Sequence, residues 1–108
     1  MTYRVVDASS FEGRRKLVGR EVEPRVLRFN QFDSQPGQEG HEHDELDSGQ
    51  EEVYVVLRGD GVLRVDGAEV PLEPGRYVLV TPVSRRQVVA GPDGLSYVVF
   101  GAVVEPPT

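Results

Sequence analysis

The sequence predicts an all-β fold, a barrel or sandwich of about eight short antiparallel strands. Valine-rich runs recur along the chain, and glycine or proline stands between them. Twelve glycines and eight prolines in 108 residues favour turns and strands over helices. Beyond the N-terminal segment, no stretch shows the 3.6-residue apolar period of a helix. We therefore expect one domain, spanning residues 1–108, with its core between strands.

The strands are expected from residue 24 onward. Residues 1–23 are predicted to form a surface arm, in which Ser9 or Ser10 could cap a helical turn. Residues 24–104 form the barrel, and 105–108 a tail. Turns are expected at SQPGQEG, Arg58–Gly61, Asp66–Gly67, Pro74–Gly75 and GPDG. The strands between them are expected at 26–33, 52–59, 62–66, 68–72, 77–82, 87–90 and 95–104.

Charge and composition exclude several classes of protein. The net charge of −6 repels phosphate backbones, so we expect no nucleic-acid partner. No apolar run has the length of about 18 residues that a membrane span needs, and no signal-peptide pattern is present. Without cysteine the chain has no disulfide, thiolate ligand or cysteine nucleophile. A cytoplasmic location is the expectation that fits this composition.

The only two histidines, His41 and His43, lie in the acidic stretch GHEHDELDSGQEEVYVV. Because side chains of a strand alternate, two residues at this spacing project from the same side of an extended chain. Glu51 and Glu52 open the strand that follows. Two neutral imidazoles and one carboxylate on one side of an ion suit iron(II), manganese or zinc, with positions left open to a substrate.

This stretch resembles the first signature of the cupin superfamily, on Gly37, His41, His43, Glu52 and Gly59. Glu52 fits better than Glu51, because six residues separate it from the glycine. The resemblance covers roughly residues 24–104 and implies a small jelly-roll β-barrel. It also implies a divalent transition metal (iron, manganese, zinc or nickel) held by His41, His43 and Glu52, and no organic cofactor.

Two departures from the family pattern leave the metal open. Eight residues separate His43 from Glu52, where cupins usually have three or four. In the later signature, Ser84 stands where glycine is usual, and Gln87 stands where the third histidine is usual. An amide oxygen is a weaker ligand than imidazole for a transition metal. A working metal site, a site that has lost its metal and an unrelated acidic loop all remain open.

Three further residues are candidates for binding a small molecule. If the segment around Gln87 is extended, Arg85 shares its inward face and Arg86 points outward. An inward arginine would suit a carboxylate or phosphate, although a surface arginine pair is the simpler interpretation. Tyr54 has the same parity as Glu52 and should line the cavity. The expected ligand-binding residues are therefore Tyr54, Arg85 and Gln87.

Three functions fit these expectations. One is a metal-dependent enzyme, similar to cupin dioxygenases or isomerases, that acts on an unknown small molecule. The second is a metal-free binding module for a small, acidic ligand. The third is an assembly domain, and in every case exposed strand edges lead us to expect a homodimer. No acid–base pair can be assigned among the many carboxylates.

Overall fold

The computed structural model describes residues 3–104, and the expected tail at 105–108 lies outside this range. Within these residues, six strands form one antiparallel sheet in the order β1-β2-β6-β3-β4, with β5 paired to β3. The strands are β1 (Arg15–Lys16), β2 (Arg28–Ser34), β3 (Gln50–Val65), β4 (Ala68–Leu72), β5 (Tyr77–Val80) and β6 (Arg86–Val103). The helices are η1 (Ala8–Ser10) and α1 (Val18–Val22). The predicted all-β jelly-roll fold is confirmed, although hydrogen bonds do not close the sheet into a barrel.

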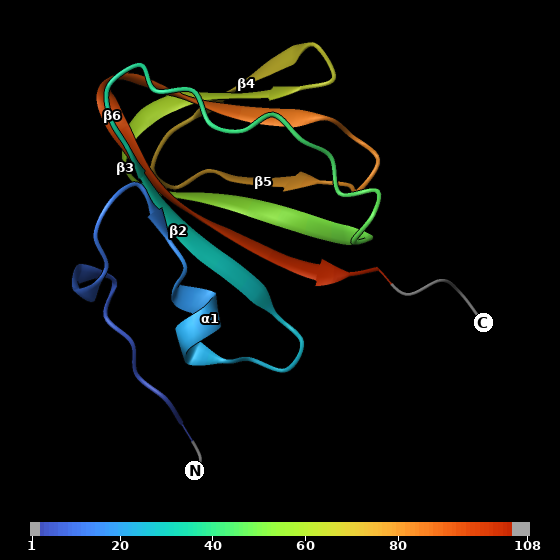
Figure 1. Cartoon of the computed structure of the whole chain (residues 1–108). Coiled ribbons are helices and arrows are strands. Elements are labelled where there is room, and N and C mark those ends of the chain that lie inside the picture. The colour runs from blue at the N-terminus through green and yellow to red at the C-terminus, as the bar shows by residue number, and fades with distance from the viewer. Residues whose placement is uncertain (1–2, 105–108) are drawn as a thin grey trace.

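Two of the expected turns are wrong. Arg58–Gly61 lies inside β3, and residues 91–94 lie inside β6. At these places the two long strands bend and pass from one layer of the fold into the other, as Figure 1 shows for β6 between β4 and β2. The pairing of β3 with β6 shifts register between Val56 and Arg58 and between Gly59 and Gly61. Such bulges bend a strand without reversing it, so six strands stand where about eight were expected.

Glycine makes the bend possible where β3 crosses β6. Gly59 and Gly94 both have φ +80°, a conformation that favours glycine. A Cβ on Gly59 would overlap the carbonyl oxygen of Gly94. The two backbones therefore approach each other more closely than any side chain would allow.

The core lies between the two layers. Its buried members are Tyr54, Val56, Leu63, Leu72, Val80, Val88, Ala90, Leu95, Tyr97 and Val99. Along the last strand, Tyr97, Val99 and Gly101 face inward, which decides between the two faces that the sequence left open. The hairpin predicted at Asp66–Gly67 is confirmed, since Val65 pairs with Ala68 across it.

The N-terminal arm belongs to the sheet rather than lying loosely on the surface. Arg15 pairs with Phe32 in the β1–β2 ladder, and the Asp33 amide donates to the Arg14 carbonyl at 2.9 Å. Gly19 of α1 packs against the backbone of Phe29. The arm thus adds an edge strand and brings its own side chains to the inner face of β2. No helix within residues 3–104 is long and apolar enough to cross a bilayer.

Candidate functional site

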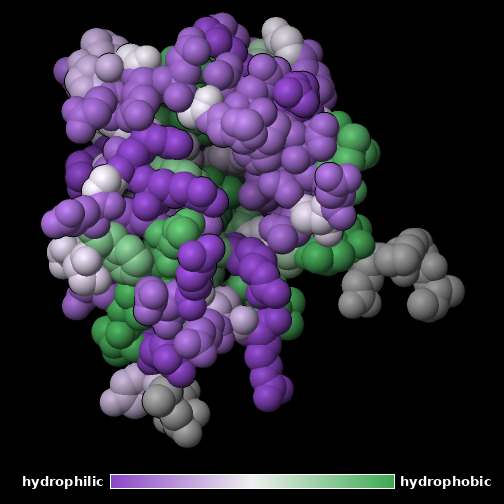
Figure 2. All heavy atoms as spheres, in the orientation of Figure 1, coloured by the Kyte–Doolittle hydropathy of each residue, from purple (hydrophilic) through white to green (hydrophobic). Residues whose placement is uncertain are grey.

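A cavity of about 520 Å³ lies between the layers, under the segment that carries the histidines. Figure 2 shows the molecule hollowed on one face, with hydrophobic residues inside and hydrophilic ones around the opening. The side chains lining the cavity fall into an acidic end, an aromatic and aliphatic wall, and an arginine end. They include His41, His43, Glu45, Gln50, Glu52, Tyr54, Gln87, Val88, Tyr97, Val99, Phe32, Asn30, Arg14, Arg15 and Arg28.

The segment from Glu39 to His43 runs antiparallel to the first part of β6. The His43 amide donates to the Arg86 carbonyl at 2.9 Å, and the Arg86 amide returns a bond of 2.8 Å. As expected for an extended segment, His41 and His43 project from one side, with ring centroids 5.9 Å apart and planes inclined by 11°. Both rings line the cavity.

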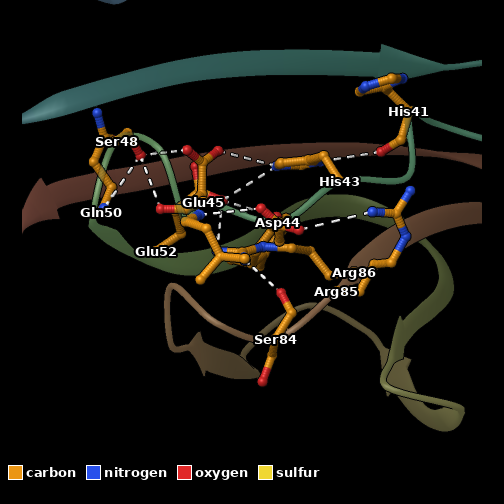
Figure 3. Close-up of polar contacts among 12 residues, drawn as sticks. His41, His43, Asp44, Glu45, Ser48, Gln50, Glu52, Ser84, Arg85 and Arg86 are labelled. Atoms are coloured by element: carbon orange, nitrogen blue, oxygen red, sulfur yellow. Dashed lines mark hydrogen bonds and ion pairs between the residues drawn. The ribbon is translucent and has the colours of Figure 1, made fainter.

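The imidazole of His43 contacts oxygen through both nitrogens. Nδ1 is 3.2 Å from the His41 carbonyl, and Nε2 is 3.2 Å from Glu45 and 3.6 Å from Glu52 (Figure 3). Carbonyl and carboxylate oxygens only accept, so the doubly protonated cation satisfies both contacts. Hydrogen bonding to Glu52, joined by the charges of Glu52 and Glu45, raises the pKa of His43 above its ordinary value of 6.5.

Glu52 is held on one oxygen by two further donors. Its Oε1 accepts from the Tyr54 hydroxyl and from Arg86 Nη2, each at 3.2 Å. Burial alone would raise the pKa of this carboxyl, but His43, Arg86 and Tyr54 together hold it below its ordinary value. Burial also raises the pKa of Tyr54, so its hydroxyl stays protonated and donates. Glu52 is therefore an anion with its charge already balanced.

The acidic loop turns back toward the cavity and supplies a second carboxylate. The Glu45 amide donates to the Pro82 carbonyl at 3.0 Å, and Ser48 Oγ donates to Glu45 Oε2 at 2.5 Å. These bonds direct Glu45 toward His43, as Figure 3 shows. The loop between His43 and Glu52 thus contributes the Glu45 carboxylate to the site.

The expected orientations of Arg85 and Arg86 are wrong, because the two are exchanged. Arg86 has no exposed side-chain surface, whereas the Arg85 side chain is 57% exposed and pairs with Glu42 at 3.0 Å. The parity of β6 is set by Val88 and Ala90, which lie in the core on the same face as Arg86. A shift of one residue in strand parity reverses every side chain. Arg86, not Arg85, is the arginine that points inward.

Gln87 borders the cavity without offering its oxygen to the cluster. Its amide nitrogen donates to the Gly40 carbonyl at 3.1 Å, and its oxygen accepts from Arg64 at 3.3 Å. Both ends of the amide are therefore occupied: the nitrogen holds the histidine segment against β6, and the oxygen is bound to Arg64 of β3. The inward position beside Glu52, where a further ligand would be needed, belongs to Arg86.

His43, Glu45 and Glu52 could hold a metal ion by spacing alone, because their ligand atoms lie within 4.8 Å of one another. His41, which the sequence assigned to the metal, is outside this group. The charges do not fit a tightly bound transition metal. A dication at Glu52 would lie beside the buried guanidinium of Arg86, which is always charged. It would also have to displace the proton of His43.

Several residues that line the cavity were not identified as site residues from the sequence. Glu45 was one acidic residue among many, and only the fold shows which of them turns inward. Arg86 was placed outward by the wrong parity. Arg14 and Arg15 lie in the arm, which sequence periodicity did not connect to the barrel. Arg28 had a usable signal, because it alternates with Asn30 and Phe32, which share the face lining the cavity.

Solved structures similar to this one include cupins. A cupin protein from Bacteroides fragilis (BF4112) is 18% identical, with TM-score 0.83 over 100% of this chain and 92% of its own. An RmlC-like cupin from Desulfovibrio desulfuricans is 26% identical, with TM-score 0.64 over 71% and 72% of the two chains. KdgF from Halomonas sp. is 20% identical, with TM-score 0.61 over 74% and 72%. None of the curated proteins matches the sequence.

A family described as "Cupin domain" matches residues 30–100, which include the histidines, Glu52, β3 and most of β6. The match covers more than half of the 108 residues. The jelly-roll topology agrees with it independently. The chain belongs to the cupin family.

Proposed function

We propose that the protein binds a small molecule in this cavity without a resident metal. The observation that carries the proposal is Arg86, a fully buried guanidinium 3.2 Å from Glu52. It places a permanent positive charge beside the carboxylate that a metal would need. Burying an arginine is costly unless its charge is matched, and Glu52 matches it.

Charge counting supports the same proposal. The cluster holds two carboxylates, Glu45 and Glu52, the guanidinium of Arg86, and His43, whose two ring nitrogens both face oxygen acceptors and whose pKa the carboxylates raise. With His43 protonated, the cluster is neutral without an added ion. A divalent cation would leave an excess of positive charge in a partly buried site, where Coulomb repulsion is strong. The competing candidate is a metal-dependent enzyme of the dioxygenase or isomerase kind, favoured by the spacing of His43, Glu45 and Glu52.

Metal affinity distinguishes the two. Untagged protein purified without chelator should contain no stoichiometric iron, manganese, zinc or nickel by elemental mass spectrometry. In calorimetric titration with Zn²⁺, Arg86→Gln should bind at least about tenfold more tightly than the wild type, because the repelling charge is gone. Arg85→Gln removes an exposed arginine next to it and should leave Zn²⁺ affinity unchanged.

The opposite result would support a metal-binding site. About one equivalent of metal in the wild type, lost in His43→Ala, would show that Arg86 accommodates the ion. The metal-dependent enzyme would then be the better proposal, and oxidation and isomerisation substrates should be screened with that ion bound.

We also propose that the expected homodimer forms through the outer face of β5, β3, β6 and β2. Register places Leu79, Val53 and Phe100 in one row across this face. Leu79 is 57% exposed and Phe100 40%, so this face presents large apolar side chains to solvent. Light scattering should give twice the chain mass of 12.0 kDa, and Leu79→Glu should halve it. Val83→Glu, at a residue that is 69% exposed and lies outside these strands, is the control, and a wild type of monomer mass would contradict the dimer.

A further inference from the structure

We infer that the ligand is a small organic acid whose carboxylate is held by Arg14 and whose far end carries a hydroxyl or amino donor. The inference rests on the proposed function, since it assigns a ligand to the same cavity. It begins from the unequal distribution of charge along the cavity. His43, Glu45 and Glu52 occupy one end, and the lining arginines Arg14 and Arg15 come from the arm, at the β1 edge of the sheet.

The positive charge of Arg14 is available to bind an anion. Within residues 3–104 it takes part in no ion pair, whereas Arg58, Arg64, Arg76 and Arg86 all contact carboxylates. Its side chain is half-buried and lines the cavity. A partly desolvated guanidinium without an anion is a strong site for a carboxylate, which it can bind through two parallel hydrogen bonds.

The surroundings of Arg14 place its guanidinium against an aromatic ring and near a second hydrogen-bond donor. Its guanidinium carbon lies 5.3 Å from the centre of the Phe32 ring, in cation–π contact. A Cβ built on Gly40 would lie 3.2 Å from the Val88 carbonyl oxygen, 3.8 Å from the Tyr97 hydroxyl and 3.9 Å from Arg14 Nη1. The hydroxyl and the guanidinium therefore both lie near the cavity wall at Gly40. An anion in the cavity beside them could accept from both the guanidinium and the Tyr97 hydroxyl, whose pKa burial raises to about 12.

The wall between the two ends suits a flat apolar body. Phe32 and Tyr97 stack with centroids 5.1 Å apart and planes inclined by 16°, and Tyr54 follows at 6.3 Å from Tyr97. Aromatic walls favour planar or ring-shaped ligands. At the acidic end, Glu45 and Glu52 are acceptors, so the ligand should present a donor there and not a second anion. Arg85, the arginine that the sequence favoured, is already paired with Glu42.

A matched set of probes tests each part of this assignment on metal-free protein. The probes are 4-hydroxybenzoate, benzoate, the neutral 4-hydroxybenzyl alcohol and phenyl phosphate, titrated by calorimetry and by amide and arginine side-chain NMR. We expect 4-hydroxybenzoate to bind most tightly. Arg14→Gln should weaken it at least about tenfold, the effect of losing one charge-assisted contact. Arg25→Gln removes an exposed arginine that does not line the cavity and should change nothing.

The Glu45→Gln variant tests the acidic end of the cavity separately. Glu45→Gln should reduce the preference for 4-hydroxybenzoate over benzoate and leave benzoate affinity unchanged. Equal binding of the neutral alcohol, or Arg14→Gln binding like wild type, would overturn the acid assignment while leaving a metal-free binding site intact. Tighter binding of phenyl phosphate would replace carboxylate by phosphate, and no binding of any probe would overturn the inference. A stoichiometric metal in the wild type would instead overturn the proposed function, so the two failures are distinguishable.

Discussion

Gly59→Ala should destabilise the protein by more than about 4 kcal/mol or prevent folding. Losses of this size are exceptional for single substitutions and arise from steric overlap or backbone strain. The added methyl would overlap the Gly94 carbonyl oxygen at the crossing of β3 and β6. It would also hold alanine at φ +80°. Neither neighbour can move without disturbing the two strands that span both layers of the fold.

Gly67→Ala is the matched control. Gly67 has φ +86°, but a Cβ there would meet no atom within 4 Å. The backbone penalty alone should cost about 1–2 kcal/mol. Urea unfolding of both variants measures the difference, which isolates the close approach of the strands. Equal losses for the two glycines would mean that the crossing can relax around a methyl group.

Arg86→Met should cost about 3 kcal/mol, near the lower end of the range for breaking a buried ion pair by removing one partner. The substitution leaves Glu52 partly buried with His43 and Tyr54 as its remaining donors. It also removes bonds to the carbonyls of Thr81 and Ser84, which hold the turn before β6. Chemical denaturation monitored by circular dichroism gives the loss.

Two further variants test whether the loss of stability comes from the Arg86–Glu52 ion pair. Arg85→Met, at the exposed neighbour, should change stability by less than about 0.5 kcal/mol. Adding Glu52→Gln to Arg86→Met should recover part of the loss, because the uncompensated charge is then gone. If the double variant is as unstable as the sum of the single changes, Arg86 acts through packing and its turn contacts and not through Glu52.

Most of the fold was predictable because it depends on local chemistry. Asp66–Gly67 has the residues that a tight hairpin requires, and the valine runs mark half-buried strands. The turns were wrongly predicted where glycine is compatible with two structures, a turn or a bend within a strand. At Gly59 and in the stretch 91–94 the same residues that make turns instead allow strands to bend and cross. Only the long-range pairing of β3 with β6 decides between a turn and a bend.

The site was harder to predict than the fold. His43 and Glu52 were identified from their spacing, and the structure brings them together at 3.6 Å. Arg86 and Arg85 were exchanged because inward parity was assigned from Gln87, whereas the core residues of β6 set it. Arg14 could not be found from periodicity at all, since its place in the cavity depends on the arm pairing with β2.

The two long strands also bear on how fast this chain can fold. Gln50 pairs with Val103 at one end of the β3–β6 ladder, and Val65 pairs with Arg86 at the other. Neither layer can be completed from neighbouring residues alone, because each contains half of β3 and half of β6. The entropy of closing these long loops must be overcome before the pairing repays it, which predicts slow folding for a domain of this size. Local opening of one layer should likewise be coupled to the other, so the slowest-exchanging amides should lie on both sides of the bend.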